Sequence, residues 1–184
     1  MERLQRSAIV LLLIESLREK GNWCGETHIQ KCTYFLQELL DVPMGFQFIL
    51  YKHGPYSFDL SDELLAMRGN GILQIELRPP YGPSISPGPR SNQLKSLFSE
   101  TLKKHVERVK FVAEELSGYK VADLERIATA VYVILNQGPR SDGRSSQAAY
   151  INEVKPHISL DAALNSLESA DRIREKAGKL VGTR

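Results

Sequence analysis

Apolar residues recur every three or four positions through most of this chain, which predicts a mainly helical protein. Such stripes stop just before Gly21, Gly69 and Gly118, as expected for helix C-termini. The stripes predict helices over residues 3–20, from Thr27 to Leu40, from Ser57 to Gly69, as one long helix from Leu94 to Leu116, from Leu124 to Val131, over 147–154, and from Ser159 onward. Thr27 and Gln30 have the spacing of a capping box, and Ser57 and Ser159 are expected to cap their helices. Leu60, Leu64 and Met67 are expected to face inward.

Two segments show the patterns of strands. Residues 46–51 are rich in aromatic and branched side chains. Leu73, Ile75 and Leu77 alternate with polar residues, which predicts a half-buried strand with these three side chains facing inward. Between them, His53-Gly54-Pro55 predicts a turn. Residues 79–90 contain five prolines, which lack an amide donor, so this stretch is expected to be an irregular linker or loop.

The order helix, helix, strand, helix, strand predicts a predominantly helical α+β protein. Its N-terminal unit would be winged-helix-like with a small antiparallel sheet, and a helical part would follow. We therefore expect a helical unit with a small sheet over 1–78, a Pro-rich linker over 79–90 and a helical region over 91–184 packed on the first unit.

Composition narrows the class of protein. A chain of 184 residues can bury a sizeable core, and a net charge of +2 does not by itself indicate a nucleic-acid partner. Two cysteines do not make a disulfide framework, which favours a reducing compartment. The apolar run 8–14 is too short to span a bilayer and lacks a signal-peptide cleavage site. We expect a cytoplasmic protein without a membrane partner.

Cys24, His28 and Cys32 are spaced four residues apart and raise the question of a zinc site, with His53 as a fourth ligand. The spacing lacks the tight C-x-x-C turns of such sites, and Cys32 belongs to an apolar stripe. Buried free cysteines are the favoured interpretation. No metal and no other cofactor is expected.

The most distinctive segment is 51–57, in which a strand ends, the chain turns and a helix begins. Amides at a helix N-terminus bind anions, and Lys52 and His53 add positive charge there. A binding role and a purely structural turn are both compatible with this pattern. The candidate binding residues are Tyr51, Lys52, His53, Gly54, Pro55, Tyr56 and Ser57.

Hydrolytic chemistry is less well indicated. Asp59, Asp62 and Glu63 follow the turn, but acids in a first helical turn commonly serve the helix dipole. The sequence contains neither a G-x-S-x-G elbow nor an H-E-x-x-H motif. We therefore expect a protein that is not an enzyme.

The motifs resemble those of a known family, the Panacea domain of SocA-like antitoxins and its uncharacterised relatives. The resemblance is carried by Gln30 to Gln37, by Phe48 to Tyr51, by His53 to Ser57, by Leu60 to Gly71, and, in the second half, by Leu124 to Ala130 and Val154 to Ser159. It implies a non-enzymatic interaction protein that neutralises a toxin by binding it directly, with the toxin encoded nearby. The family supplies no catalytic residue and no metal ligand.

A winged-helix-like DNA-binding regulator is the alternative function. Its nucleic-acid contacts would come from Lys31, Lys52, His53 and Arg68. Acidic residues at the start of the third helix would repel DNA, which makes this alternative less favourable. The sequence predicts neither the oligomeric state nor the identity of the partner.

Overall fold

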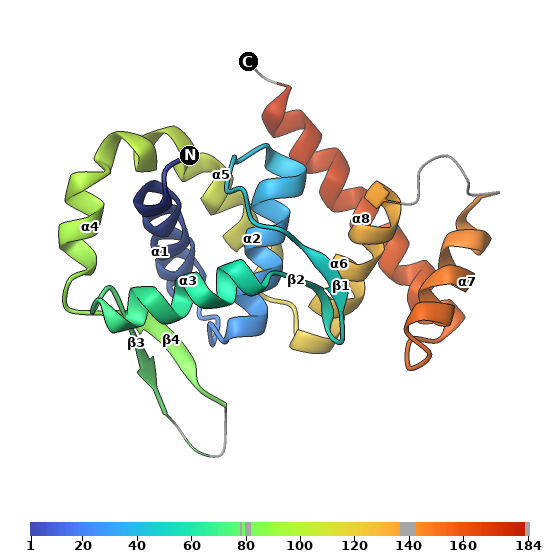
Figure 1. Cartoon of the computed structure of the whole chain (residues 1–184). Helices are drawn as coiled ribbons and strands as arrows, with labels where there is room; N and C mark the ends of the chain where they lie inside the picture. The colour runs from blue at the N-terminus through green and yellow to red at the C-terminus, as the bar shows by residue number, and fades with distance from the viewer. Residues whose placement is uncertain (78, 80–81, 137–142, 183–184) are drawn as a thin grey trace.

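The structure is a computed structural model of the whole chain, and it describes residues 1–77, 79, 82–136 and 143–182. Within these residues the chain forms helices and two short antiparallel sheets (Figure 1). In chain order the elements are α1 (Arg3–Glu19), α2 (Glu26–Leu40), β1 (Ile49–Tyr51), β2 (Gly54–Tyr56), α3 (Phe58–Gly69), β3 (Leu73–Glu76), β4 (Ser84–Pro87), α4 (Ser91–Leu97), α5 (Ser99–Leu116), α6 (Val121–Asn136), α7 (Arg144–Val154) and α8 (Leu160–Val181).

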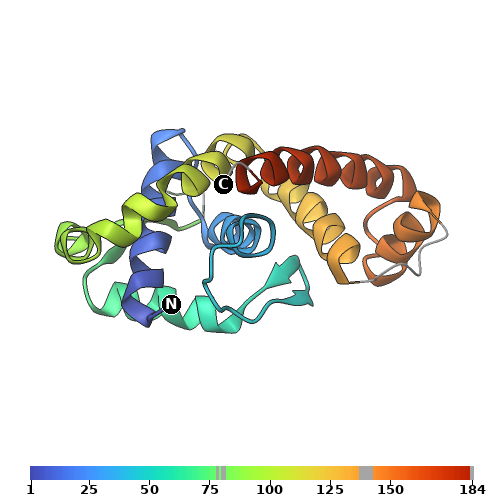
Figure 2. The same cartoon turned by 90° about the horizontal axis from the view of Figure 1, so that it is seen from above.

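Helix α2 lies at the centre of the fold. It packs against α1, α5, α6 and α8, with α3 and β2 also in contact (Figures 1 and 2). Because it is covered on nearly every side, most of its side chains are buried, including Ile29, Tyr34, Phe35 and Leu36. One hydrophobic core therefore runs along α2 and joins the two ends of the molecule.

The remaining helices cover α2 from both ends. α1 packs on α5 and closes one end together with α3 and α4, while α6, α7 and α8 pack on each other at the opposite end (Figure 2). Helices α5, α6 and α8 thus do not form a separate body, because all three contact α2.

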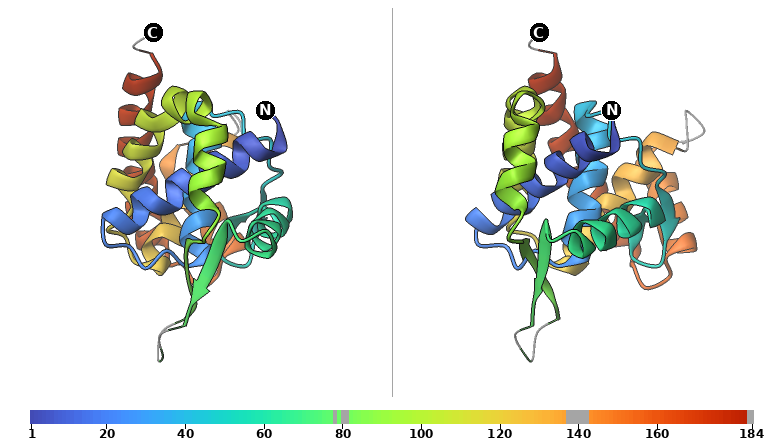
Figure 3. Two further views of the ribbon diagram at one scale, coloured as in Figure 1. Left: turned by 90° about the vertical axis from the view of Figure 1, so that its left-hand side faces the viewer. Right: turned by 60° about the vertical axis from the view of Figure 1, so that its left-hand side comes forward.

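The two sheets are hairpins that lie apart. β1 pairs with β2 beside α6, with Tyr51 opposite Gly54. β3 pairs with β4, with Ile75 opposite Ile85, and this hairpin extends away from the helical body (Figures 1 and 3).

The expectation of an irregular linker over 79–90 was wrong for residues 84–87, which form β4. Two prolines stand at the ends of this strand, where a missing amide is tolerated: Pro83 precedes it and Pro87 is its last residue. Ser84 Oγ donates to the Trp23 carbonyl at 2.6 Å, which fixes the start of the strand. Within the predicted linker, residues 80 and 81 lie outside the described residues.

Three further predictions need correction. The helix expected from Leu94 to Leu116 is broken at Phe98, whose backbone leaves the helical region. Gly54-Pro55 is not the turn but the start of β2, and Lys52-His53 make the turn. The predicted inward position of Leu77 is also wrong, since its side chain is 75% exposed.

The predicted fold class is confirmed: the chain is a predominantly helical α+β protein with small antiparallel sheets. The predicted serine caps are also present, since Ser57 accepts a hydrogen bond from the Leu60 amide and Ser159 from the Ala162 amide. Within the described ranges, no helix combines the length and the apolar character needed to cross a membrane.

Candidate functional site

The β1–β2 hairpin lies directly on helix α6. Gly54 has a φ of +82°, and a Cβ at this position would lie 3.1 Å from Thr129 Oγ1 and 3.2 Å from the Glu125 carbonyl oxygen. An L side chain would be strained here by its backbone conformation and crowded by α6. Glycine therefore allows the hairpin backbone to approach the helix this closely.

A buried carboxylate holds the turn of the hairpin. Glu125 on α6 is almost fully buried, and its Oε2 lies 3.2 Å from His53 Nδ1. Its other oxygen, Oε1, lies 3.3 Å from Nε2 of His157, which comes from the segment between α7 and α8. One carboxylate thus connects two imidazoles that are 104 residues apart in sequence, each with a side chain about 60% exposed.

Two lysines complete this charged cluster. Lys155 donates from Nζ to the backbone carbonyls of Tyr51 and Lys52, and so holds the end of β1. Lys31 on α2 is only 2% exposed and lies under Gly54. Burial lowers the pKa of Lys31 to about 8, although the nearby Glu125 carboxylate opposes this and raises it.

We name Lys31, His53, Glu125, Lys155 and His157 the hairpin clamp. Its contacts fasten β1–β2 to α2, α6 and the α7–α8 connection, so they fix the hairpin in one position. A carboxylate that orients an imidazole is also an arrangement used for proton transfer. In the clamp, however, both imidazoles lie at the surface rather than in a deep cleft.

The outer side of the hairpin carries exposed aromatic rings. Tyr51, Tyr56 and Phe58 form a mutual cluster, with ring centroids 5.1 to 5.8 Å apart. Tyr51 is 52% exposed and Phe58 is 54% exposed, and the neighbouring Ile49 is also exposed. We name Tyr51, Tyr56 and Phe58 the ring cluster.

Acidic groups lie beside the ring cluster. Glu26 Oε1 accepts hydrogen bonds from Tyr56 Oη at 3.2 Å and from Ser61 Oγ at 2.9 Å. Burial raises the pKa of the Tyr56 phenol, and the Glu26 and Asp62 carboxylates raise it further. Of these two carboxylates, Glu26 is the one hydrogen-bonded to the Tyr56 hydroxyl.

The structure divides the seven predicted binding residues into two groups. Tyr51, Lys52 and His53 are exposed, and Tyr56 is half-buried. The others are buried: Gly54, Pro55 and Ser57. These three shape the hairpin but are not accessible to a partner, which corrects the expectation that all seven form contacts.

The backbone of Ser57 is held by Gln30 of α2. Its backbone amide donates to Gln30 Oε1 and its carbonyl accepts from Gln30 Nε2, both at 2.9 Å. The predicted capping box of Thr27 and Gln30 was therefore wrong, and Gly25 is the N-cap of α2.

One of the four predicted nucleic-acid contacts is not accessible. Lys52, His53 and Arg68 are exposed, but Lys31 is buried and cannot reach a phosphate. Lys31 is therefore removed from the set of nucleic-acid contacts.

Sequence reasoning did not identify Glu125, Lys155, His157 or Phe58 as site residues. The first three lie in the segments 124–130 and 154–159, whose only signal in the sequence is the resemblance to the Panacea family. The structure brings both segments against the turn at His53. Phe58 had no signal beyond its apolar character, because it belongs to the first helical turn rather than to the strand.

Cys24, His28 and Cys32 do not converge on a common point. Cys24 precedes α2, and burial raises the pKa of its thiol to about 12; burial also raises the pKa of Cys32. His28 Nε2 lies 3.0 Å from the Tyr119 carbonyl oxygen. Among the residues that the structure describes, no three His, Cys, Asp or Glu side chains are placed to hold a metal ion.

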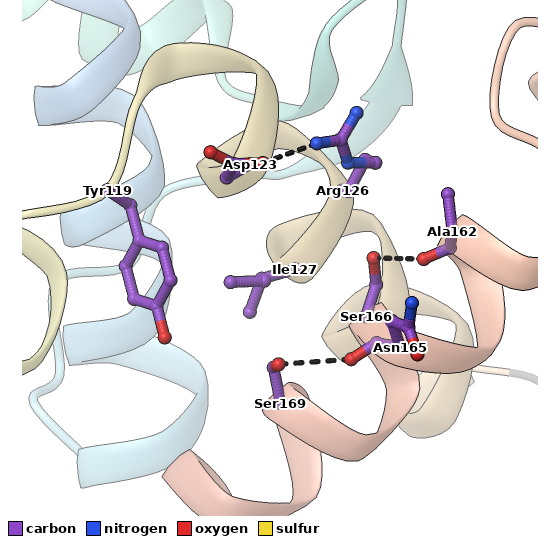
Figure 4. Close-up of a pocket in the computed structure, with 8 residues that line it drawn as sticks. All are labelled: Tyr119, Asp123, Arg126, Ile127, Ala162, Asn165, Ser166 and Ser169. Atoms are coloured by element: carbon purple, nitrogen blue, oxygen red, sulfur yellow. Dashed lines mark hydrogen bonds and ion pairs between the residues drawn. The ribbon is translucent and has the colours of Figure 1, made fainter.

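A cavity of about 370 Å³ lies between α6 and α8 (Figure 4). Tyr119 and Ile127 line one side, and Ser166 and Ser169 line the other (Figure 4). Both serine hydroxyls donate to carbonyls of their own helix. The charged residues in its lining, Asp123 and Arg126, pair with each other (Figure 4).

Comparison with protein-family models gives no match, and comparison with curated proteins gives no significant match. The resemblance to the Panacea domain therefore stays a prediction from the motifs.

Proposed function

We propose that this protein is a non-enzymatic interaction module, resembling a toxin-neutralising antitoxin, that binds a protein partner through the ring cluster. The observation that carries this proposal is the group of Tyr51, Tyr56 and Phe58, which contact each other at the surface. Contiguous exposed apolar surface is a mark of interaction sites, and tyrosine is enriched among residues that dominate binding energy.

The hairpin clamp supports the same function. It fixes the hairpin through Glu125 and Lys155, so the rings are held before a partner arrives. A preorganised surface loses less conformational entropy on binding than a mobile one. Segments 51–57, 124–130 and 154–159 also contact one another, and their motifs are among those that carry the antitoxin resemblance.

Co-expression with the products of neighbouring genes tests the proposal. We expect one product to copurify with the protein and its toxicity to growth to be relieved. The double variant Tyr51→Ser/Phe58→Ser should lose both effects while keeping its circular dichroism spectrum, because both side chains are largely exposed.

Leu97→Ser is the matched control. Leu97 is also an exposed apolar side chain, but it lies on α4, away from the β1–β2 hairpin (Figure 1). Equal capture by the wild type and the Tyr51→Ser/Phe58→Ser variant would refute the role of the ring cluster. If no neighbouring product binds or is neutralised, the antitoxin-like function itself is refuted.

DNA binding is a second candidate, favoured by one observation. Helices α1, α2 and α3 are followed directly by the projecting β3–β4 hairpin, as in a winged helix (Figure 3). The contacts would come from Lys52, His53 and Arg68, which are exposed. A gel shift with duplex DNA tests this candidate, and absence of binding at low salt would exclude it.

A further inference from the structure

A second cavity lies between α3 and the β3–β4 hairpin, and its volume is about 190 Å³. Its lining is apolar on the inside, where Leu64 and Ile85 are buried, and Leu65 stands exposed at its edge. The volume is below the roughly 300–1,000 Å³ of pockets that hold small-molecule ligands. A single apolar side chain of a partner suits such a space better.

One side of this cavity is acidic. Glu26 and Asp62 both line it, and neither forms an ion pair with a cation in the described part of the chain. Arg68 lines the cavity as well, six residues after Asp62 on α3. The two exposed carboxylates thus outnumber the one arginine that lines the cavity, and they lie next to apolar surface.

The cavity is continuous with the ring cluster. Glu26 accepts a hydrogen bond from Tyr56 of the cluster and another from Ser61, which also lines the cavity. A cationic side chain placed at Glu26 would therefore also lie close to aromatic rings. Cations are attracted to the faces of such rings.

We propose that this cavity and the ring cluster together receive a basic, amphipathic segment of the protein partner. An apolar side chain of the segment enters the cavity, and a lysine or arginine beside it pairs with Glu26 and Asp62. This inference rests on the proposed function and names the chemistry of the partner. Charge complementarity selects a cationic protein segment and disfavours a phosphate backbone at the same surface.

The test uses two short synthetic helical peptides that differ only in charge, one built from leucine and lysine and the other from leucine and glutamate. We expect the wild type to bind the lysine peptide, more weakly as salt increases, and not the glutamate peptide. The double variant Glu26→Gln/Asp62→Asn should lose about tenfold or more in affinity for the lysine peptide. Glutamine at position 26 keeps an acceptor for Tyr56 and Ser61, so the fold is preserved.

Glu100→Gln/Glu107→Gln on α5 is the matched control, because it removes two exposed carboxylates elsewhere. Methyl NMR shifts of Leu64, Leu65 and Ile85 should change on titration with the lysine peptide. Equal loss in both double variants, binding of the glutamate peptide, or shifts confined to another face would each overturn the inference.

The same variants separate this inference from the proposed function. If Glu26→Gln/Asp62→Asn captures the neighbouring gene product as the wild type does, while the Tyr51→Ser/Phe58→Ser variant does not, the function stands and the acidic site is refuted. If both variants capture the product normally, the ring cluster has no role and both proposals fail.

Discussion

Lys31 gives the folding stability a specific dependence on pH. Burial under the β1–β2 hairpin lowers its pKa from 10.5 to about 8, against the opposing effect of Glu125. Above pH 10.5 the lysine is neutral in both the folded and the unfolded chain. Between pH 10.5 and 8 the unfolded chain binds the proton and the folded protein does not, so the free energy of unfolding decreases as the pH falls.

The expected size of this effect follows from the two pKa values. A lowering from 10.5 to about 8 corresponds to roughly 3 kcal/mol, since each pH unit is worth about 1.4 kcal/mol. Below pH 8 the whole cost is present, and at pH 10.5 most of it has disappeared. For a protein with a stability of about 5–15 kcal/mol, this is a measurable share.

Urea unfolding of the wild type and Lys31→Met at pH 7, 8, 9 and 10.5, followed by circular dichroism, measures the effect. Cys24 and Tyr34 have raised pKa values and also affect stability at high pH, but they are present in both proteins and cancel in the difference. We expect the wild type to gain about 3 kcal/mol relative to Lys31→Met between pH 8 and 10.5.

Lys52→Met is the matched control, because Lys52 is an exposed lysine in the turn above Lys31. It corrects for the loss of a positive charge from the same region. A stability difference between the wild type and Lys31→Met that stays constant from pH 8 to 10.5 would refute the idea that burial holds the pKa of Lys31 down.

Four further substitutions test the fold by thermal and urea unfolding. Gly54→Ala should cost about 2 kcal/mol or more, because φ is +82° and α6 is close. Gly178→Ala in the last turn of α8, where a Cβ meets open space, should stabilise by about 0.5–1 kcal/mol, and equal effects of the two substitutions would contradict the close approach at Gly54. Ser159→Ala should cost about 1 kcal/mol through loss of the α8 cap, and an unchanged stability would show that the cap is dispensable. Leu36→Ala in the centre of α2 should cost about 2–5 kcal/mol, and a loss below 1 kcal/mol would contradict its full burial.

Features set by neighbouring residues could be predicted from the sequence. Ser57 and Ser159 cap their helices as expected, because an N-cap acts on an amide only three residues away. The apolar stripes also identify the buried faces, such as Leu60, Leu64 and Met67 of α3. Periodicity does not report a change of direction, however, so the stripe continues through Phe98 although the helix there breaks into α4 and α5.

Features set by tertiary contacts could not be predicted. Gln30 has the spacing of a capping box, yet the fold places it beside Ser57, whose two backbone groups it satisfies. Glu125 in turn looks like an ordinary helix acid until the fold brings His53 and His157 to its two oxygens. No local pattern encodes a contact between residues so far apart along the chain.

The clamp and the ring cluster are opposite sides of one short hairpin, and this explains why costly buried charges are found here. A two-stranded hairpin alone is marginally stable in water, so β1–β2 could not present Tyr51 and Tyr56 in a fixed geometry by itself. Lys155 binds the backbone at Tyr51, and Glu125 holds the turn at His53. The buried ions therefore act on the side that faces the core, and they hold rigid the side that carries the exposed rings.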